Sequence, residues 1–354
     1  MVIRTFITHK QAELFSDCQD RFGVNPDTKS IAVSDGMGST WQQKIWAQLL
    51  VDTYTDSTDW YPLNETIKPL CQTWRSKVAD FIQNLKETNA PENMIYRNER
   101  NFAEGRSAGA TFVGIRFNGN EWSGSVLGDS CLIEWDGNEA KFNTSQDSET
   151  FDSYPDYFDS DASKEGKGVP KPIEGTLTEG KYLLLVSDPF SDFLLEHSKQ
   201  GCIAMYVQQL LSLASHDDFE TLVCKWRKEG MHNDDTTLVI VENDNSDVLA
   251  ISHADVLEDL VRYENLSLTS APQTLEKAAT SNENQILEKE EDIDNIVVVQ
   301  SNEKAFMTEF LTEYQRCLQK KFPKQMGKLK YKWTQKAVEE ALGILFEKYS
   351  VIKK

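Results

Sequence analysis

Apolar and polar residues alternate in short blocks along the first part of the chain, and the blocks differ in their period. Residues 3–7 and 30–34 are apolar runs of strand length that end in turn residues, which predicts two β-strands. Residues 40–60 and 64–87 carry apolar side chains at steps of three and four, which predicts two amphipathic helices. The chain is therefore expected to begin with strands and to continue into a helical pair.

Strand-like segments return in the middle of the chain. Residues 108–117 and 121–135 are rich in β-branched and aromatic side chains, and the pair Asn118-Gly119 between them is typical of a hairpin turn. Residues 144–170 are polar and acidic, and they predict a long surface loop. Long loops in compact domains are often functional, so this loop is of interest.

Two nearly continuous apolar runs, residues 181–187 and 236–241, predict buried strands. Residues 190–229, which lie between them, are mostly helical in pattern. The order is thus strands, two helices, strands, helices and a final strand. This order predicts an α+β protein whose sheets are covered by helices, and not a repeating βαβ fold.

The composition narrows the class of protein. The 354 residues include 57 Asp or Glu and 37 Lys or Arg, which gives a formal net charge of -20. This length allows one large domain with an appendage, or two domains. The negative charge argues against a nucleic-acid-binding body and against binding to anionic membranes, because both of these partners require basic surface.

Targeting and redox signals are lacking in the sequence. No apolar stretch approaches 18 residues, and the first ten residues contain no apolar run of signal-peptide length. The six cysteines form no C-x-x-C pair, so they indicate neither a zinc knuckle nor a redox pair. We therefore expect a cytoplasmic protein in a reduced setting.

A change of composition near residue 243 divides the chain into three segments. Residues 1–242 are expected to form one domain. Residues 243–300 are acidic and rich in Asn, Ser and Glu, which predicts a linker with one helix around 253–264. Residues 301–354 contain 12 Lys or Arg and 6 Asp or Glu, and their apolar residues recur at helical spacing.

Two interpretations of the basic helical segment 301–354 remain open. It is either a small helical hairpin that packs on the body or on a second copy, or a docking module for an acidic partner. Such a partner could be the substrate or a cognate Ser/Thr kinase. Nucleic acid is a weaker alternative, because the acidic body would repel it.

Four aspartates at strand ends are the candidate chemical groups. Asp35, Asp129 and Asp188 each follow a predicted strand, and Asp234 precedes one. Carboxylates that converge repel one another unless a cation neutralises them, and a ligand set made only of Asp oxygens suits Mg²⁺ or Mn²⁺ better than zinc. Asp at a strand end is also a common turn or helix-cap residue, so spacing alone does not establish a shared site.

Six short motifs resemble, in the same order, those of the metal-dependent protein phosphatases of type 2C. The resemblance is closest to bacterial members that carry Cys-Gln-Asp near the start, and it covers about residues 1–242. The motifs are Cys18-Gln19-Asp20, Ser34-Asp35-Gly36-Met37-Gly38, Ser107-Ala108-Gly109-Ala110-Thr111, Leu127-Gly128-Asp129-Ser130, Val186-Ser187-Asp188 and Asp234-Asp235-Thr236-Thr237.

The resemblance implies two stacked, mostly antiparallel sheets flanked by helices, with a binuclear Mn²⁺ or Mg²⁺ centre between the sheets. In this pattern Asp35 would bridge both ions and the carbonyl of Gly36 would bind one of them. Asp188 and Asp234 would hold the other ion. Asp129 would help Asp188 to hold a third, looser ion.

The reaction that the resemblance implies is hydrolysis of a phosphoserine or phosphothreonine protein substrate. A metal-bridging water would attack phosphorus without a covalent phosphoenzyme. Asp35 and Asp20 would take the catalytic roles, and Asp20 would act mainly through metal-bound waters.

Two departures from the family pattern leave an alternative open. Pro189 stands where the family usually has Gly, and proline pushes the preceding Asp188 toward extended geometry. The phosphate-binding Arg of the family is missing at its usual spacing, which leaves Arg4, His9 and Arg21 as candidates. The alternative is therefore an inactive phosphatase-like module that binds phosphoproteins.

Overall fold

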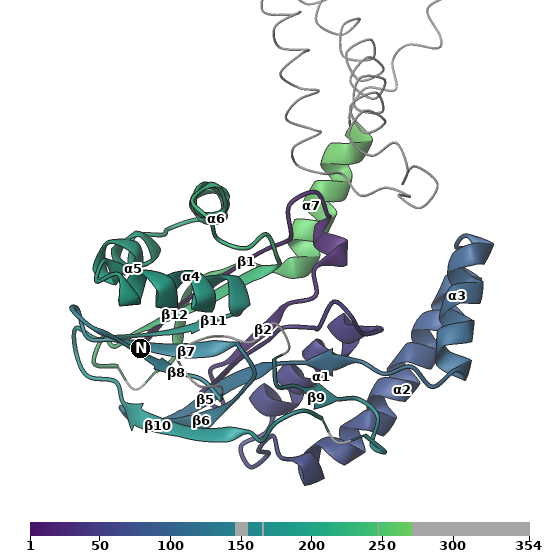
Figure 1. The fold of residues 1–354 in the computed structure, drawn as a ribbon, viewed down its shortest axis with the longest axis horizontal. Coiled ribbons are helices and arrows are strands. Elements are labelled where there is room, and N and C mark those ends of the chain that lie inside the picture. Colours follow the sequence, from purple (N-terminus) through teal and green to yellow (C-terminus); the bar gives the residue numbers. More distant parts are fainter. Residues whose placement is uncertain (146–154, 165, 247, 271–354) are drawn as a thin grey trace, which may run out of the picture. The chain divides into compact units, whose positions relative to one another are not determined.

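The computed structural model describes residues 1–145, 155–164, 166–246 and 248–270, and these residues form two β-sheets with helices on their outer sides (Figure 1). The segment 301–354 and the larger part of the predicted linker lie outside the described residues. The predicted α+β class, with two mostly antiparallel sheets, is confirmed.

The first sheet has six described strands in the order β13-β1-β12-β11-β7-β8. All neighbouring strands are antiparallel except β13, which runs parallel to β1. Their bounds are β1 (Val2–Thr8), β7 (Cys131–Trp135), β8 (Ala140–Asn143), β11 (Tyr182–Val186), β12 (Thr236–Glu242) and β13 (Ala250–Ala254).

The second sheet has five described strands in the order β10-β6-β5-β3-β2, all antiparallel to their neighbours. Their bounds are β2 (Arg21–Asn25), β3 (Ser30–Ser34), β5 (Phe112–Asn118), β6 (Glu121–Leu127) and β10 (Lys171–Thr176). A short pair, β4 (Gly109–Ala110) and β9 (Phe158–Asp159), lies beside this sheet's helices.

Helices cover the outer faces of the sheets (Figure 1). The helices α4 (Asp188–Lys199), α5 (Ile203–Leu211) and α6 (His216–Lys228) lie on the first sheet, whereas α1 (Gln43–Asp56) and α2 (Asn64–Glu87) lie on the second. The remaining helical elements are η1 (Phe15–Asp17), α3 (Glu92–Ala103) and α7 (Leu257–Ser270).

The alternation of side chains along each strand explains why both sheets are buried on both faces. In β12, Leu238 and Ile240 face the helices α4 to α6, whereas Val239 and Val241 point between the sheets. There they join a cluster that also contains residues of β3, β5 and β6. Because successive residues of a strand point to opposite faces, a strand covered on both sides is continuously apolar, as the sequence pattern indicated.

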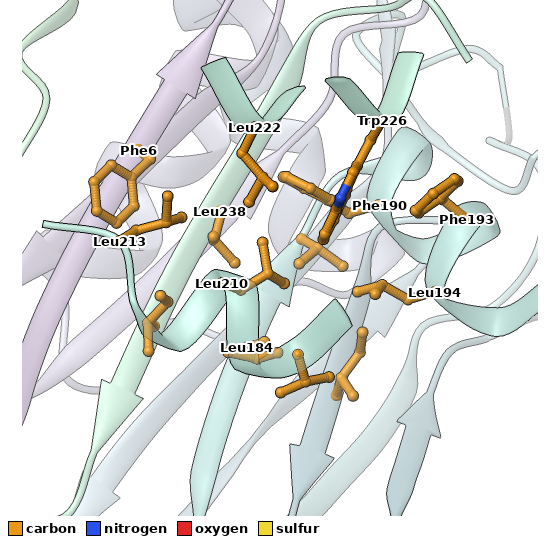
Figure 2. Close-up of a cluster of buried hydrophobic side chains, with 14 of the residues drawn as sticks. Phe6, Leu184, Phe190, Phe193, Leu194, Leu210, Leu213, Leu222, Trp226 and Leu238 are labelled. Atoms are coloured by element: carbon orange, nitrogen blue, oxygen red, sulfur yellow. The ribbon is translucent and has the colours of Figure 1, made fainter. Parts of the chain in front are cut away.

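An aromatic cluster fixes α4, which begins at the end of β11 (Figure 2). Trp226 of α6 stacks on Phe193 with ring centroids 5.0 Å apart, and it meets Phe190 edge-on at 5.6 Å. Rings of this size each bury 150–250 Å², so the cluster contributes a large share of the packing energy. It holds the first turn of α4, and hence Asp188, rigidly against the sheet.

Several predicted elements differ from the observed ones. The predicted strand 121–135 is two strands, because the turn 128–130 interrupts it at Asp129. The first part of the predicted linker contains β13 and α7, so the folded region continues beyond residue 242. β13 is mostly exposed and therefore carries no alternating apolar signal. Among the helices described here, none is long and apolar enough to cross a membrane.

Candidate metal centre

Five of the six predicted site residues line one pocket of about 460 Å³. These residues are Asp35, Gly36, Asp129, Asp188 and Asp234. The sixth, Asp20, is not part of the pocket wall and has no exposed surface. The structure therefore brings together acids that are far apart in the sequence, and it places Asp20 behind the others.

The acids at the pocket come from strand ends of both sheets. Asp35 follows β3 of the second sheet, and its carbonyl oxygen accepts a hydrogen bond from Thr111 N at 2.9 Å. Asp188 follows β11 of the first sheet, where Ser187 Oγ accepts a hydrogen bond from Thr237 N at 2.9 Å. Strand ends that are tied to their neighbours in this way hold the attached carboxylates in fixed positions.

The turn that carries Asp129 is tied to the segment before β5 and to the first turn of α4. The hydroxyls of Thr111 and Ser130 lie 2.6 Å apart, which links this turn to the end of β4. Ser191 of α4 donates its hydroxyl proton to the carbonyl of Asp129 at 2.8 Å. Asp129 itself is only 8% exposed.

Burial and repulsion from neighbouring acids raise the pKa values of Asp20, Asp35, Asp129 and Asp188. Burial is the largest cause in each case, and it raises the pKa of Asp20 to about 7 and that of Asp129 to about 7. The pKa of Asp35 is raised well above its ordinary value by burial and then by Asp20, Asp188 and Asp129. The pKa of Asp188 is raised in the same way by burial and neighbouring acids. Keeping all of these carboxylates ionised therefore costs folding free energy unless a cation neutralises them.

Positive charge at the pocket is scarce. Of the residues described at its wall, only Lys10 and His232 are basic. Lys10 Nζ lies 3.0 Å from Asp234 Oδ1, and His232 lies 3.9 Å from Asp192. One lysine and one histidine are few basic groups beside this number of carboxylates.

The donor atoms fit a hard divalent cation. Asp20 Oδ1 and Asp129 Oδ1 are buried and have no hydrogen-bond partner. Carboxylate and carbonyl oxygens are the ligands that Mg²⁺ and Mn²⁺ prefer. In the part of the chain that the structure describes, no three His, Cys, Asp or Glu side chains form a ready cation cage. A cation here would therefore be held by few carboxylates at a time, with backbone oxygens and water completing its shell.

Comparison with known proteins gives the family. A family model described as Protein phosphatase 2C matches residues 9–226. The chain belongs to the protein phosphatase 2C family. The matched segment contains every predicted site residue except Asp234, and it ends before β12, β13 and α7. No curated protein sequence matches this chain.

Solved structures that resemble this one are bacterial phosphatases. The S. agalactiae serine/threonine phosphatase is 18% identical, with 68% of this chain and 99% of that chain covered and a TM-score of 0.43. The Mycobacterium tuberculosis serine/threonine phosphatase PstP/Ppp is 16% identical, with 68% and 98% covered and a TM-score of 0.42. The catalytic domain of PstP in complex with two manganese ions is 15% identical, with 70% and 97% covered and a TM-score of 0.41.

The first departure from the family pattern, Pro189, is accommodated by the fold. Ser187 is the N-cap of α4 with extended backbone angles (φ -82°, ψ 174°), and Asp188 is the first helical residue. Pro189 then occupies the first turn, where its missing N–H has no helical partner to lose. The expectation that proline holds Asp188 itself in extended geometry is therefore wrong, and Ser187 is extended instead.

The second departure is the missing phosphate-binding Arg. The three residues that were candidates to replace it make their contacts away from the pocket. Arg4 donates to main-chain oxygens at the end of α5 and just after it, and Arg21 donates to main-chain oxygens beside its own position. His9 lies against Glu264 of α7. None of the three lines the pocket, whereas Lys10 does. Sequence reasoning overlooked Lys10, because no periodicity or motif in its local sequence distinguishes it from an ordinary surface lysine.

Proposed function

We propose that this chain is a Mn²⁺- or Mg²⁺-dependent phosphatase that hydrolyses phosphoserine and phosphothreonine in proteins. The observation that carries this proposal is the convergence of buried and half-buried aspartates, with few basic neighbours, on one pocket in a chain of the phosphatase 2C family. An all-oxygen donor set with raised pKa values is what a divalent cation would stabilise. The proposal assigns the pocket to the cations and to the phosphate ester.

The residues that would hold the cations follow from their positions at the pocket wall. Asp35 would contact two ions, with the Gly36 carbonyl on one of them and Asp188 and Asp234 on the other. Asp129 would help Asp188 with a third, looser ion. When bound, the ions would supply Lewis acidity that lowers the pKa of water and polarises the phosphoryl group.

The protein's own groups would orient the reaction. Asp20 Oδ2 accepts a hydrogen bond from Thr237 Oγ1 at 2.8 Å, which fixes this carboxylate and leaves Oδ1 without a protein partner beside Asp35. Asp20 is therefore placed to hold ordered water through Oδ1. Asp35 and Asp20 would together align the attacking water, which is the catalytic role that we propose for them.

Lys10 would bind the phosphate ester in place of the family's Arg. Its ammonium group lies at the pocket wall and pairs with Asp234, which a bound cation would neutralise. Lys10 would then be free to contact a phosphate oxygen as a point charge. The segment 301–354 lies outside the described residues, and both predictions for it stand: a helical hairpin that packs on the body or on a second copy, or a docking module for an acidic partner such as the substrate or a cognate kinase.

Hydrolysis by the purified full chain tests the function. With millimolar Mn²⁺ the protein should release phosphate from p-nitrophenyl phosphate and from phosphoserine and phosphothreonine peptides, and EDTA should abolish the release. Phosphopeptide binding without turnover in any of Mn²⁺, Mg²⁺ or Co²⁺ would instead establish the alternative, an inactive phosphate-binding module. The geometry of α4 and the presence of Lys10 both support the active form.

Replacement of Lys10 is expected to weaken substrate binding. Lys10→Met should raise the KM for p-nitrophenyl phosphate about ten- to hundredfold, because a hydrogen bond to a charged group is worth about 1.5–3 kcal/mol. The kcat should change less, since Lys10 does not hold the attacking water. Lys10→Arg should retain most of the affinity. The matched control is Lys141→Met, which removes an exposed lysine paired with Glu134 far from the pocket. An unchanged KM in Lys10→Met would remove Lys10 from the site.

A further inference from the structure

A single loop, residues 9–20, carries Lys10 and Gln19 to the pocket wall and ends at Asp20. Both ends of this loop are bound to one carboxylate. Asp235 Oδ1 accepts a hydrogen bond from Lys10 N at 2.8 Å, and Asp235 Oδ2 accepts one from Gln19 N at 2.7 Å. Asp235 therefore closes the base of the loop, and Asn233 Oδ1 accepts a further hydrogen bond from Gln11 N at 2.8 Å.

The middle of the loop is held by helix α7, which Figure 1 shows beside the purple N-terminal segment. Glu264 Oε2 accepts a hydrogen bond from Phe15 N at 2.9 Å, and Glu264 Oε1 lies 3.6 Å from His9 Nε2. The rings of His9 and Phe15 meet edge-on with their centroids 4.4 Å apart. Glu264 thus contacts the loop both next to Lys10 and at η1.

The base of α7 is itself firmly anchored to the phosphatase core. Asp255, whose side chain is 2% exposed, accepts a hydrogen bond from Ile7 N at 2.9 Å. It also pairs with His216 at 2.8 Å and with His253 at 3.1 Å. Burial lowers the pKa of His216, but hydrogen bonds to Asp255 and Glu220 outweigh this and raise the pKa to about 9. The positive charge of His216 at neutral pH therefore strengthens the anchor.

These contacts come from a part of the chain that the family model does not include. The match to the phosphatase 2C model ends at residue 226, whereas Asp255 and Glu264 lie after β12. The loop that Glu264 contacts lies far earlier in the chain, since Phe15 and Glu264 are separated by 249 positions. The C-terminal addition therefore reaches the wall of the pocket through the loop.

We propose that Glu264 is a positioning residue for the phosphate-binding wall, which acts by holding loop 9–20 so that Lys10 reaches the pocket. Glu264 contacts no substrate and acts only through the loop. This inference rests on the proposed function, because it assumes that the pocket binds a phosphate ester. It gives α7 a role in setting the affinity of the site, beyond its contribution to folding.

The test compares variants of the full chain with two readouts. Glu264→Ala should accelerate hydrogen exchange at the Phe15 amide of the cation-free protein about tenfold, because this amide loses its acceptor. It should also raise the KM for p-nitrophenyl phosphate about 3- to 10-fold at saturating Mn²⁺, while kcat stays within about twofold. Glu264→Gln keeps an oxygen that can accept from Phe15 N, so it should restore KM to within about threefold of the wild type.

Asp259→Asn is the matched control, because Asp259 is an exposed acid on the same helix that pairs with Arg262 and does not contact the loop. It should change neither exchange at Phe15 nor KM.

Unchanged exchange in Glu264→Ala would overturn the inference, and so would faster exchange with an unchanged KM. If Asp259→Asn and Glu264→Ala change exchange and KM equally, α7 contributes only general stability, and the inference about Glu264 is wrong. If the wild type hydrolyses nothing, the proposed function fails, and the positioning role fails with it, whereas the exchange result still decides whether Glu264 holds the loop.

Discussion

Asp35→Asn is expected to lower kcat/KM for p-nitrophenyl phosphate by about a thousandfold or more. Asp35 lines the pocket, and burial followed by repulsion from Asp20, Asp188 and Asp129 raises its pKa, so it lies among the other acids. An amide carries no charge and binds a hard cation poorly, so the variant should lose the cation and with it several kcal/mol of transition-state stabilisation. Steady-state kinetics across a Mn²⁺ titration would measure the loss, and calorimetry would measure Mn²⁺ binding directly.

A matched control separates this effect from the loss of any half-buried acid. Asp52 lies on α1, is half-buried, has a pKa raised by burial and accepts a hydrogen bond from Gln48. Asp52→Asn should therefore keep wild-type activity and Mn²⁺ binding. If Asp35→Asn hydrolyses substrate at the wild-type rate, Asp35 has no part in the reaction.

The stability of the cation-free protein is expected to fall as the pH rises from about 4 to about 7. The pKa values of Asp20 and Asp129 are about 7 in the folded protein, against 3.8 for the free side chain. An acid with a raised pKa binds more protons in the folded state, so its stabilisation is complete below about pH 4 and is lost as the pH passes through about 7. The difference for Asp20 alone corresponds to the order of 4 kcal/mol of unfolding free energy.

Urea unfolding at pH 5 and pH 8, in EDTA and in Mn²⁺, would measure this dependence. Mn²⁺ should restore the free energy of unfolding at pH 8, because it binds the folded state and neutralises the cluster. Asp20→Asn should make the free energy of unfolding depend less on pH in EDTA, because an amide does not titrate. The variant should still fold, since Asn can accept the hydrogen bond from Thr237. An identical pH dependence in the wild type and Asp20→Asn would contradict the account.

The sequence predicted that each acid lies at the end of a strand, but it could not show that these strand ends meet in one pocket. Each acid lies at the end of a strand whose apolar pattern is clear, as in residues 182–186 and 236–242. That the strand ends meet depends on pairing across the chain, for example between β11 and β12, and a single sequence does not show this pairing. Only the resemblance of the six motifs to those of the phosphatase 2C family indicated that the acids share one site.

The supporting residues were not predictable for a different physical reason. Lys10 lies in a turn without periodicity, and its place at the pocket depends on Asp235 and Glu264, which are more than 200 positions away. β13 and α7 lie in an acidic, Asn-rich region that has the composition of a linker. Their stability comes from docking on β1 and η1, and not from a strong local pattern. Long-range hydrogen bonds of this kind leave no trace in hydrophobic periodicity.

The most direct measurement is anomalous scattering from crystals of the full chain soaked in millimolar Mn²⁺. Two strong anomalous peaks are expected in the pocket, both beside Asp35, with Asp188 and the Gly36 carbonyl at their sides. The same crystals of Asp35→Asn should lose these peaks. A pocket without any anomalous peak in well-ordered wild-type crystals would contradict the claim that these aspartates form a divalent-cation centre.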